Sequence, residues 1–587
     1  MYSSVGNLQI DYALHWVPEL HFNLNLGYQV SKNNWESFEQ PNTPGLWDGN
    51  YKNGAGTHWR KYELQRNTLL DFYINYRKDF TQIKSNLDVM VGYSWQRFDY
   101  HGNEYTNINT LGFVNDFNTI YSNGTYTLNW DQSTDKYIGH TYNNSPIQKW
   151  GNILQLVSFF GRLNYSFDDT YLLTFTLRDD GTSRFSKDHR WGLFPSVALG
   201  WKIINMPFME DAHEVMNDFK LRLGWGITGQ QDISKYFYYM PMYTDSYKQG
   251  FQYLNPNGNG QWINPLYPGA YNPDLKWEET TTWNIGVDLA FLNNRITVAA
   301  DWYKRQTKDL LSNVPVGGFN TENRMFQNIG NMENTGVEVT IGARPIVTPE
   351  FTWSTALNFG YNKNKITKLN AARVGANDMS MPGGYGGFIG WNIVGEPAST
   401  FMVYEQVYDS AGNPIEGQYV DQNADGTIDD QDLIKFHSRD PKATFTWNNN
   451  FTWKGWDLGI SLRANVGNYV YNTPRRNSTK LFSSAAAQYQ VTNLIADTYL
   501  FKTDDPNMNF SSYFVENASF IRCDNITLGY TFDKLLNGGL NLRLFGAVQN
   551  PFVITKYKGI DPEVFNGVDD NCYPRPVTCT LGLVATF

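Results

Sequence analysis

Lys220-Leu-Arg-Leu-Gly-Trp-Gly-Ile-Thr228 is the stretch of sequence that decides the fold, because apolar and polar or small residues alternate along it without a break. Successive side chains of a β-strand point to opposite faces. This period of two places four apolar side chains on one face: Leu221, Leu223, Trp225 and Ile227. The opposite face carries Lys220 and Arg222. The stretch therefore predicts a strand with one apolar and one polar face.

The same alternation recurs along the chain. Further clear examples are residues 284–291, 296–303, 337–341, 456–466, 525–533 and 577–587. Roughly sixteen to eighteen runs of about ten residues can be counted, and that length suits a tilted strand crossing a membrane. Charged residues such as Asp288 and Arg463 stand in the middle of the polar faces. A wet lumen accommodates them better than the surface of a soluble sandwich, so we expect an all-β, transmembrane antiparallel β-barrel.

The connections between these runs alternate between short and long. Phe291-Leu-Asn-Asn-Arg295 is a tight, Asn-rich turn. In contrast, the segments around 100–150, 230–275, 370–440 and 470–515 are long, polar and rich in Gly, Asn and Tyr. Bacterial barrels have short periplasmic turns and long extracellular loops. We therefore expect the long segments to form the outer, ligand-facing surface.

Composition narrows the class of protein further. Aromatic residues make up 16% of the 587 residues, as expected for rings at two membrane interfaces. No run approaches the roughly 18 apolar residues of a membrane helix, which excludes an α-helical membrane protein. The net charge of -10 disfavours nucleic acid. The three cysteines form neither a zinc site nor a disulfide framework, although Cys572 and Cys579 are close enough in sequence to pair.

One loop has a pattern typical of metal binding. Asp421-Gln-Asn-Ala-Asp-Gly-Thr-Ile-Asp-Asp-Gln-Asp432 follows the spacing of a calcium-binding loop, with Gly426 at the sharp bend. The candidate Ca²⁺ ligands are Asp421, Asn423, Asp425, the Thr427 carbonyl, Asp429 and Asp432. The alternative is an Asx-turn loop with exposed carboxylates. A bound ion would stiffen a long outer loop and would have no catalytic role.

Aromatic clusters in the long loops are candidates for ligand contact. They are Tyr236, Tyr238, Tyr385, Phe388 and Trp391, whose rings could stack on sugars; the alternative is packing between loops or an aromatic girdle. The chain has no Gly-x-Ser-x-Gly elbow, no His-Glu-x-x-His and no P-loop, so we expect no enzyme activity.

Several stretches, in matching order over about residues 150 to 587, resemble the SusC/RagA family of TonB-dependent outer-membrane transporters. One is Tyr557-Lys-Gly-Ile-Asp-Pro-Glu563. The others are residues 178–185, 194–201, 221–230, 277–286, 328–338, 519–530 and 549–552. The C-terminal Phe587, which closes an alternating strand, resembles the signal read by barrel-assembly machinery.

The resemblance implies a plugged barrel of about 22 strands, of which residues 1–587 would form the C-terminal portion. It also implies a SusD-like surface lipoprotein, oligosaccharide or peptide ligands, energy from a TonB complex, and a dimer of transporter–lipoprotein pairs. The family's N-terminal signal, TonB box and plug are not recognisable in this sequence. We therefore expect the plug and first strands to lie outside this chain. The alternative function is a passive porin-like or structural outer-membrane barrel.

Overall fold

A computed structural model describes most of the chain. The described residues are 1–39, 56–109, 126–131, 136–142, 148–233, 236–241, 243–245, 253–254, 262–263, 266–315, 324–370, 373–375, 379, 387–479, 499–502, 505–535, 539–570 and 573–586. Among them, none of the helices is long and apolar enough to cross a membrane.

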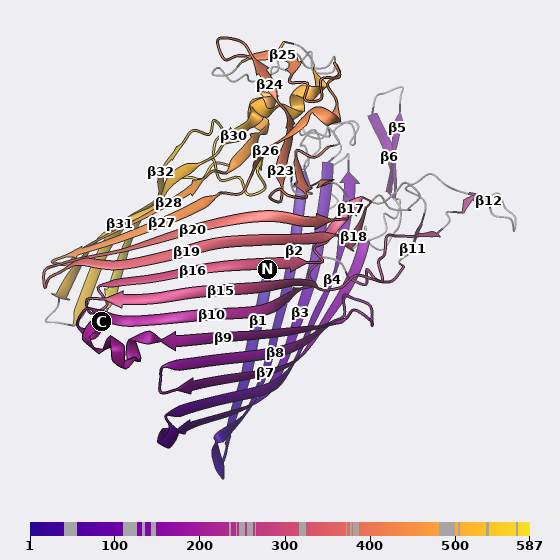
Figure 1. Cartoon of the computed structure of the whole chain (residues 1–587). Coiled ribbons are helices and arrows are strands. Elements are labelled where there is room, and N and C mark those ends of the chain that lie inside the picture. Colours follow the sequence, from indigo (N-terminus) through magenta and orange to yellow (C-terminus); the bar gives the residue numbers. More distant parts are fainter. Residues whose placement is uncertain are drawn as a thin grey trace.

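The main body is a 17-stranded sheet (Figure 1). Each strand pairs antiparallel with the next strand of the sheet along the chain. Its strands are β1 (Tyr2–Leu14), β2 (Val17–Glu39), β3 (Gly56–Phe80), β4 (Ser85–Asn109), β7 (Gln148–Phe167), β8 (Tyr171–Thr182), β9 (Trp191–Lys202), β10 (Met216–Gln230), β15 (Glu278–Phe291), β16 (Ile296–Lys308), β19 (Gly330–Val347), β20 (Phe351–Leu369), β27 (Ala443–Trp453), β28 (Trp456–Val466), β31 (Phe520–Leu535), β32 (Leu540–Thr555) and β34 (Thr578–Thr586). The number of strands agrees with the sixteen to eighteen alternating runs in the sequence.

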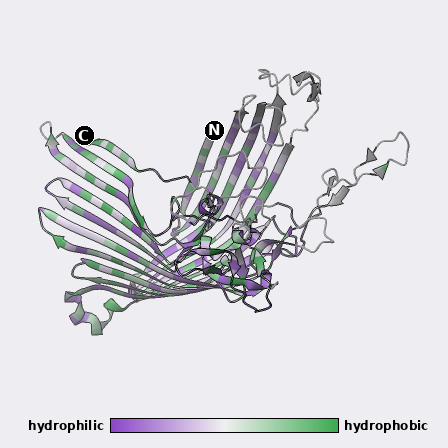
Figure 2. Cartoon of the chain, turned by 90° about the horizontal axis from the view of Figure 1, so that it is seen from above, coloured by the Kyte–Doolittle hydropathy of each residue, from purple (hydrophilic) through white to green (hydrophobic). Residues whose placement is uncertain are grey.

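The sheet is strongly curved, and its edge strands β1 and β34 lie on the same open side (Figure 2). No pairing between them occurs among the described residues, so this part of the chain does not close into a barrel. The predicted total of about 22 strands is therefore not seen in this structure. The hydropathy colours alternate along the strands, as the period of two predicts.

The alternation separates two faces of the sheet. On β9, Leu193 and Leu199 are exposed on the apolar face, and Trp191 and Trp201 stand at the two ends of the same row. Aromatic rings at both ends of an apolar band are typical of strands that cross a bilayer. Side chains on the opposite face are largely polar, and they form the ion pairs described below.

Most strands of the sheet are longer than the predicted ten residues. The sheet includes strands of 25 residues, β3 and β4, and ends on β34, which has 9 residues. About ten residues suffice to cross the hydrocarbon core, so the longest strands continue well beyond it. The additional residues still form backbone hydrogen bonds with the neighbouring strands. Outside the hydrocarbon core neither face of a strand meets lipid, so their sequence does not need to alternate between apolar and polar side chains.

Short turns and long connections lie at opposite ends of the sheet (Figure 1). The predicted turn after Phe291 is present, and Leu292, Asn293 and Asn294 all have positive φ. Asn adopts this left-handed conformation more readily than most residues, which explains the Asn-rich sequence. The long connections carry small sheets built from β5 (Tyr126–Asp131), β6 (Lys136–Tyr142), β11 (Tyr243–Asp245), β12 (Tyr253–Leu254), β13 (Trp262–Ile263), β14 (Leu266–Pro268), β17 (Leu311–Pro315) and β18 (Arg324–Asn328).

Three long connections, residues 370–442, 467–519 and 556–577, contribute to one packed unit, which we call the loop assembly. Its buried core draws on all three: Met379, Ile389, Phe401, Val403, Tyr471, Phe501, Met508, Phe514, Val515 and Val568. Its strands are β21 (Arg373–Gly375), β22 (Gly390–Ile393), β23 (Thr400–Tyr404), β24 (Gln406–Tyr408), β25 (Pro414–Tyr419), β26 (Leu433–Ser438), β29 (Tyr469–Asn472), β30 (Val515–Asn517) and β33 (Val568–Asp569).

Short helices complete the described fold. The α-helix α2 spans Thr473–Asn477 in the loop assembly. The 3₁₀ helices are η2 (Thr81–Ile83), η3 (Ile203–Asn205), η4 (Pro207–Glu214), η7 (Asp430–Asp432), η9 (Pro506–Phe510) and η10 (Ser512–Phe514). Polar contacts also join the connections: the Ser511 hydroxyl donates to Gln406 Oε1 at 2.8 Å, and Gln406 N–H donates to the Ser512 hydroxyl at 3.1 Å.

The two faces of β31 give a direct test of the membrane orientation. Leu528→Arg places a charge on the apolar face, and we expect it to destabilise the barrel by about 2–4 kcal/mol if the residue lies near the bilayer midplane. The matched control is Thr527→Arg on the polar face, where the flanking residues Gly459 and Ala547 are small. We expect the control to cost less than about 1 kcal/mol. Urea unfolding from lipid vesicles measures both, and equal losses would contradict the assignment of the faces.

Candidate functional site

The predicted aromatic residues of the 230–275 segment lie at the end of the sheet that carries the long connections. Tyr238 packs on a buried cluster that includes Phe185 and Trp277. Its ring meets Phe326 of β18 edge-on at 5.5 Å, and its hydroxyl accepts the Phe326 N–H at 3.2 Å. The guanidinium carbon of Arg184 lies 5.0 Å from the centre of the Tyr236 ring. Both tyrosines are half-buried, so part of each side chain remains accessible.

The second aromatic pair lies near Arg324, the first residue of β18. The rings of Phe388 and Trp391 meet edge-on at 5.8 Å, and the Trp391 indole N–H donates to the Phe388 carbonyl at 3.0 Å. The Arg324 guanidinium carbon is 5.6 Å from the centre of the Phe388 ring. Tyr385 lies outside the described residues.

β18 therefore contacts both aromatic groups, because Phe326 contacts Tyr238 and Arg324 lies against Phe388. We call this set of five residues the β18 aromatic surface: Tyr236, Tyr238, Phe326, Phe388 and Trp391. Half-exposed rings beside a guanidinium group offer apolar area together with hydrogen-bond donors. Such a surface can bind a ligand that has both apolar faces and polar groups, as sugars and peptides do.

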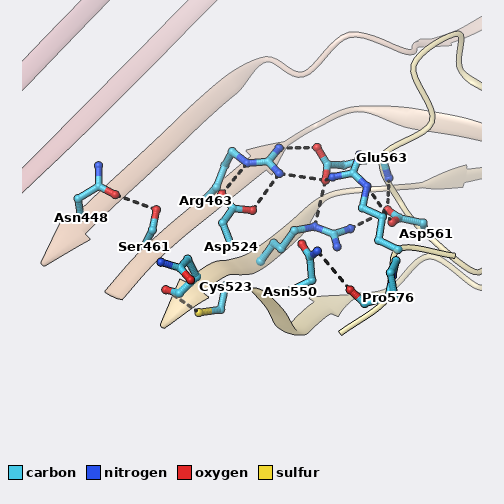
Figure 3. Close-up of polar contacts among 12 residues, drawn as sticks. Asn448, Ser461, Arg463, Cys523, Asp524, Asn550, Asp561, Glu563 and Pro576 are labelled. Carbon is cyan, nitrogen blue, oxygen red and sulfur yellow. Dashed lines mark hydrogen bonds and ion pairs between the residues drawn. The ribbon is translucent and has the colours of Figure 1, made fainter. Parts of the chain in front are cut away.

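An ionic network joins the strands to the last long connection (Figure 3). Arg463 of β28 bonds both oxygens of Asp524 on β31 at 3.1 Å. It also contacts both oxygens of Glu563, which follows β32 in the chain. A guanidinium group that holds two carboxylates in this way fixes their relative orientation.

The centre of this network is buried. Arg522 of β31 is only 4% exposed; it lies 2.6 Å from Asp561 and 3.0 Å from Glu563. Arg575, which is 42% exposed, reaches the same two carboxylates from the segment before β34. Three arginines and three acids therefore balance in charge and hold the 556–577 connection against β28 and β31. Buried charges of this kind are tolerated only when they are paired.

Other charged groups form ion pairs between strands of the polar face that are adjacent or separated by one strand. Arg222 of β10 donates to Asp288 of β15 at 2.8 Å and to Asp301 of β16 at 2.8 Å. Arg543 of β32 donates to Asp457 of β28 at 2.9 Å. These groups are only partly buried, as expected for a face that remains in contact with water.

The predicted calcium loop connects β25 to β26 and lies in the loop assembly. Its side chains accept a series of backbone N–H groups: Gly426 N–H bonds Asp421 at 2.8 Å, Asp425 N–H bonds Asn423 at 3.0 Å, and Thr427 N–H bonds Asp425 at 2.8 Å. Within the described residues, no group of three or more His, Cys, Asp or Glu side chains gathers to hold a metal ion. A metal in this loop would therefore also need the Asn423 amide and the Thr427 carbonyl as ligands.

Two other predicted features are only partly described. Cys579 is exposed on β34, and Cys572 lies outside the described residues, so their pairing stays a prediction. Phe587 also lies outside them.

Sequence reasoning missed the ionic network, although four of its six residues stand in stretches that carry the family resemblance. Arg522 and Asp524 belong to 519–530, and Asp561 and Glu563 belong to 557–563. The available signal was the run of charged residues at positions that a membrane strand would otherwise fill with neutral side chains.

Comparison with known proteins identifies the family. Residues 6–551 match the family described as TonB dependent receptor-like, beta-barrel. The chain is 40% identical to the TonB-dependent receptor SusC of Bacteroides thetaiotaomicron, over 99% of this chain and 56% of SusC. It is 29% identical to the TonB-dependent receptor P3 of Formosa agariphila, over 90% of this chain and 53% of that protein. The chain thus spans about half the length of these curated relatives.

A solved structure of the RagAB peptide transporter has a similar fold. The TM-score is 0.77 at 22% identity, and the alignment covers 99% of this chain and 61% of that chain. Together with the family match, these findings show that the chain belongs to the TonB-dependent receptor β-barrels, in the SusC/RagA group. It is an outer-membrane protein, and the predicted family and location are confirmed.

Proposed function

We propose that this protein takes part in TonB-dependent import of oligosaccharides, or of oligopeptides, that a SusD-like surface lipoprotein delivers. The observation that carries the proposal is the 40% identity to SusC over 99% of the chain. In this proposal two transporter–lipoprotein pairs form one assembly, and the long connections face the outside of the cell, as in other bacterial barrels.

Three features of the structure support a delivered, oligomeric ligand. The loop assembly is a packed body with its own core, and a firm surface suits the docking of a second protein better than separate loops do. The β18 aromatic surface lies on neighbouring connections and offers rings for stacking. The ion pairs of Arg222 and Arg543 keep the polar face hydrated for a polar cargo.

Uptake by whole cells tests the proposal. Cells that produce the full-length protein receive fluorescent oligosaccharides or fluorescent oligopeptides, with or without a protonophore that removes the energy for TonB. We expect one class of ligand to accumulate, and only in energised cells. Uptake that persists with the protonophore would instead identify a passive pore, and uptake of neither class would reject both ligand assignments.

The β18 aromatic surface makes a residue-level prediction for the same assay. We expect Trp391→Ala to weaken ligand binding by about 0.5–1.5 kcal/mol, or roughly two- to thirteenfold, because one stacking ring is lost. The control is Phe565→Ala, which removes a ring that is 99% exposed on the 556–577 connection. The apparent affinity for uptake is the measurement. Equal values for both variants and the unaltered protein would remove Trp391 from the ligand site.

A further inference from the structure

The apolar face of β15, β16, β19 and β20 ends at one level toward the long connections. These four strands lie side by side in the sheet (Figure 1). The last fully apolar row across them runs through direct partners in the register: Ile285, Trp302, Val337 and Tyr361. Aromatic rings at the end of an apolar band mark the membrane interface. The next side chains outward on this face therefore lie at the level of the lipid headgroups.

The positions that follow on the same face of β16 and β20 are basic. Lys304 and Lys363 lie on the two sides of Thr335 in the register. Lys365 lies opposite Glu333, which forms an ion pair with Lys304 at 3.1 Å. Lys363 and Lys365 are exposed, and within the described part of the chain neither forms an ion pair with a carboxylate. We call Lys304, Lys363 and Lys365 the lysine patch.

The lysine patch is positive in a chain that is acidic as a whole. Its three lysines and Glu333 together carry a net charge of +2, whereas the chain carries -10. Further out, Lys308 lies opposite Glu279, so these two charges balance. The Cα atoms of Lys304 and Lys363 are two strand spacings apart, or about 10 Å. Because lysine side chains are long and flexible, their ammonium groups can converge on one phosphate between them.

An apolar groove lies in the sheet beside the lysine patch. Its volume of about 490 Å³ is within the range of roughly 300–1,000 Å³ that is typical of ligand pockets. Trp225 and Trp283 pair directly at its outer end, with their ring centres 6.0 Å apart. The groove continues inward between Leu199 and Leu223. Lys304 lies opposite Trp283 in the register, so the groove opens directly onto the lysine patch.

We propose that the groove and the lysine patch together bind one phosphorylated lipid of the outer leaflet. An acyl chain lies in the groove against the two indole rings, and the phosphate of the headgroup contacts the ammonium groups. A lipid fits better than a protein segment, because the groove is on the face that meets bilayer hydrocarbon and its outer end is positive. The inference uses the orientation given above, with the long connections outside the cell, and it does not depend on import.

Binding of lipid A to the purified full-length protein in detergent tests the proposal. Lipid A is a phosphorylated disaccharide with several acyl chains, and native mass spectrometry counts the molecules that the protein retains. We expect one tightly held molecule, and binding at least tenfold weaker after the phosphates are removed from the lipid. The double variant Lys363→Gln with Lys365→Gln should weaken binding roughly 25-fold, or about fivefold for each lysine. The matched control is Lys202→Gln with Lys220→Gln, which removes two paired lysines from the polar face and should bind normally.

A second pair of variants tests the groove. Ile285→Trp places a larger ring in the groove and should weaken the binding of lipid A at least tenfold. The control is Leu173→Trp, which fills a separate part of the apolar face, nearer the short turns, and should bind normally. Because both changes keep the face apolar, we expect the barrel to fold, and the migration of the unheated protein on a gel verifies this for each variant.

Three outcomes would overturn the proposal. One is equal binding of lipid A with and without its phosphates. Another is binding that the lysine variants and Ile285→Trp leave unchanged, which would place the lipid elsewhere. The third is full displacement of lipid A by an excess of inorganic phosphate, which would mean that the patch binds free anions and the groove plays no part. Cells that lack uptake although their purified protein retains lipid A would reject the proposed import function and leave this inference intact.

Discussion

Arg522→Ala is expected to destabilise the barrel by about 3–5 kcal/mol. The substitution removes the buried cation that holds Asp561 and Glu563, and it leaves their carboxylates short of a partner in a site with little water. The cost of an uncompensated buried charge is much larger than the value of the original ion pair. Urea unfolding of the protein in lipid vesicles measures the loss.

The control for Arg522 lies in the same network. Arg575→Ala removes an arginine that contacts the same two acids but is 42% exposed, so water can replace it. We expect a loss of no more than about 1 kcal/mol. Similar losses for Arg522 and Arg575 would show that burial does not set the energetics of this network. A double variant, Arg522→Ala with Asp561→Ala, should lose less than the sum of its single variants, since the two groups interact directly.

Phe401→Ala is expected to open the loop assembly while the sheet remains folded. Phe401, on β23, is completely buried in the core that all three connections share, and replacing a buried Phe with Ala costs about 3–5 kcal/mol. The strands of the sheet are held by their own backbone hydrogen bonds, so the loss of stability is confined to the loop assembly. Limited proteolysis within 370–442 should accelerate by roughly 10²–10⁴-fold, because cleavage follows the population of the opened loop.

The same experiment separates loop opening from unfolding of the sheet. The migration of the unheated barrel on a gel should not change for Phe401→Ala. Phe565→Ala removes a fully exposed ring from one of the three connections and should leave proteolysis unchanged. If Phe401→Ala unfolds the sheet together with the loops, the assembly is not a separate unit of stability.

The sheet could be predicted from the sequence because its signal is local. Alternation within 221–227 and 285–291 identifies two strands, and the structure pairs them directly, with Leu223 opposite Ile285. The extended ends of β3 and β4 could not be predicted, because outside the bilayer no solvent difference separates their two faces. Alternation alone does not distinguish one class of β-barrel from another. The family resemblance identified the class of protein and its location.

The loop assembly and the ionic network could not be predicted, since their contacts join residues far apart in the chain. Met379, Tyr471 and Val568 meet in one core but stand in three connections with no common period. Arg463 and Glu563 are 100 residues apart, and neither position indicates its partner. The four aromatic candidates that the structure describes lie in the long connections, but their contacts with β18 depend on tertiary packing.

The order of strand pairing also has a consequence for how the molecule is built. Every strand of the sheet pairs with its neighbour in the chain, so the sheet can grow by adding one hairpin after another, each closing a limited stretch of chain. The loop assembly differs, because Tyr471 pairs with Val568 and so needs the connection between β32 and β34. The hairpins can therefore assemble progressively, whereas the outer unit becomes complete only when the last connection is in place. A ribosome or a membrane-insertion pathway that stalls before this point leaves a curved sheet with an unfinished outer surface.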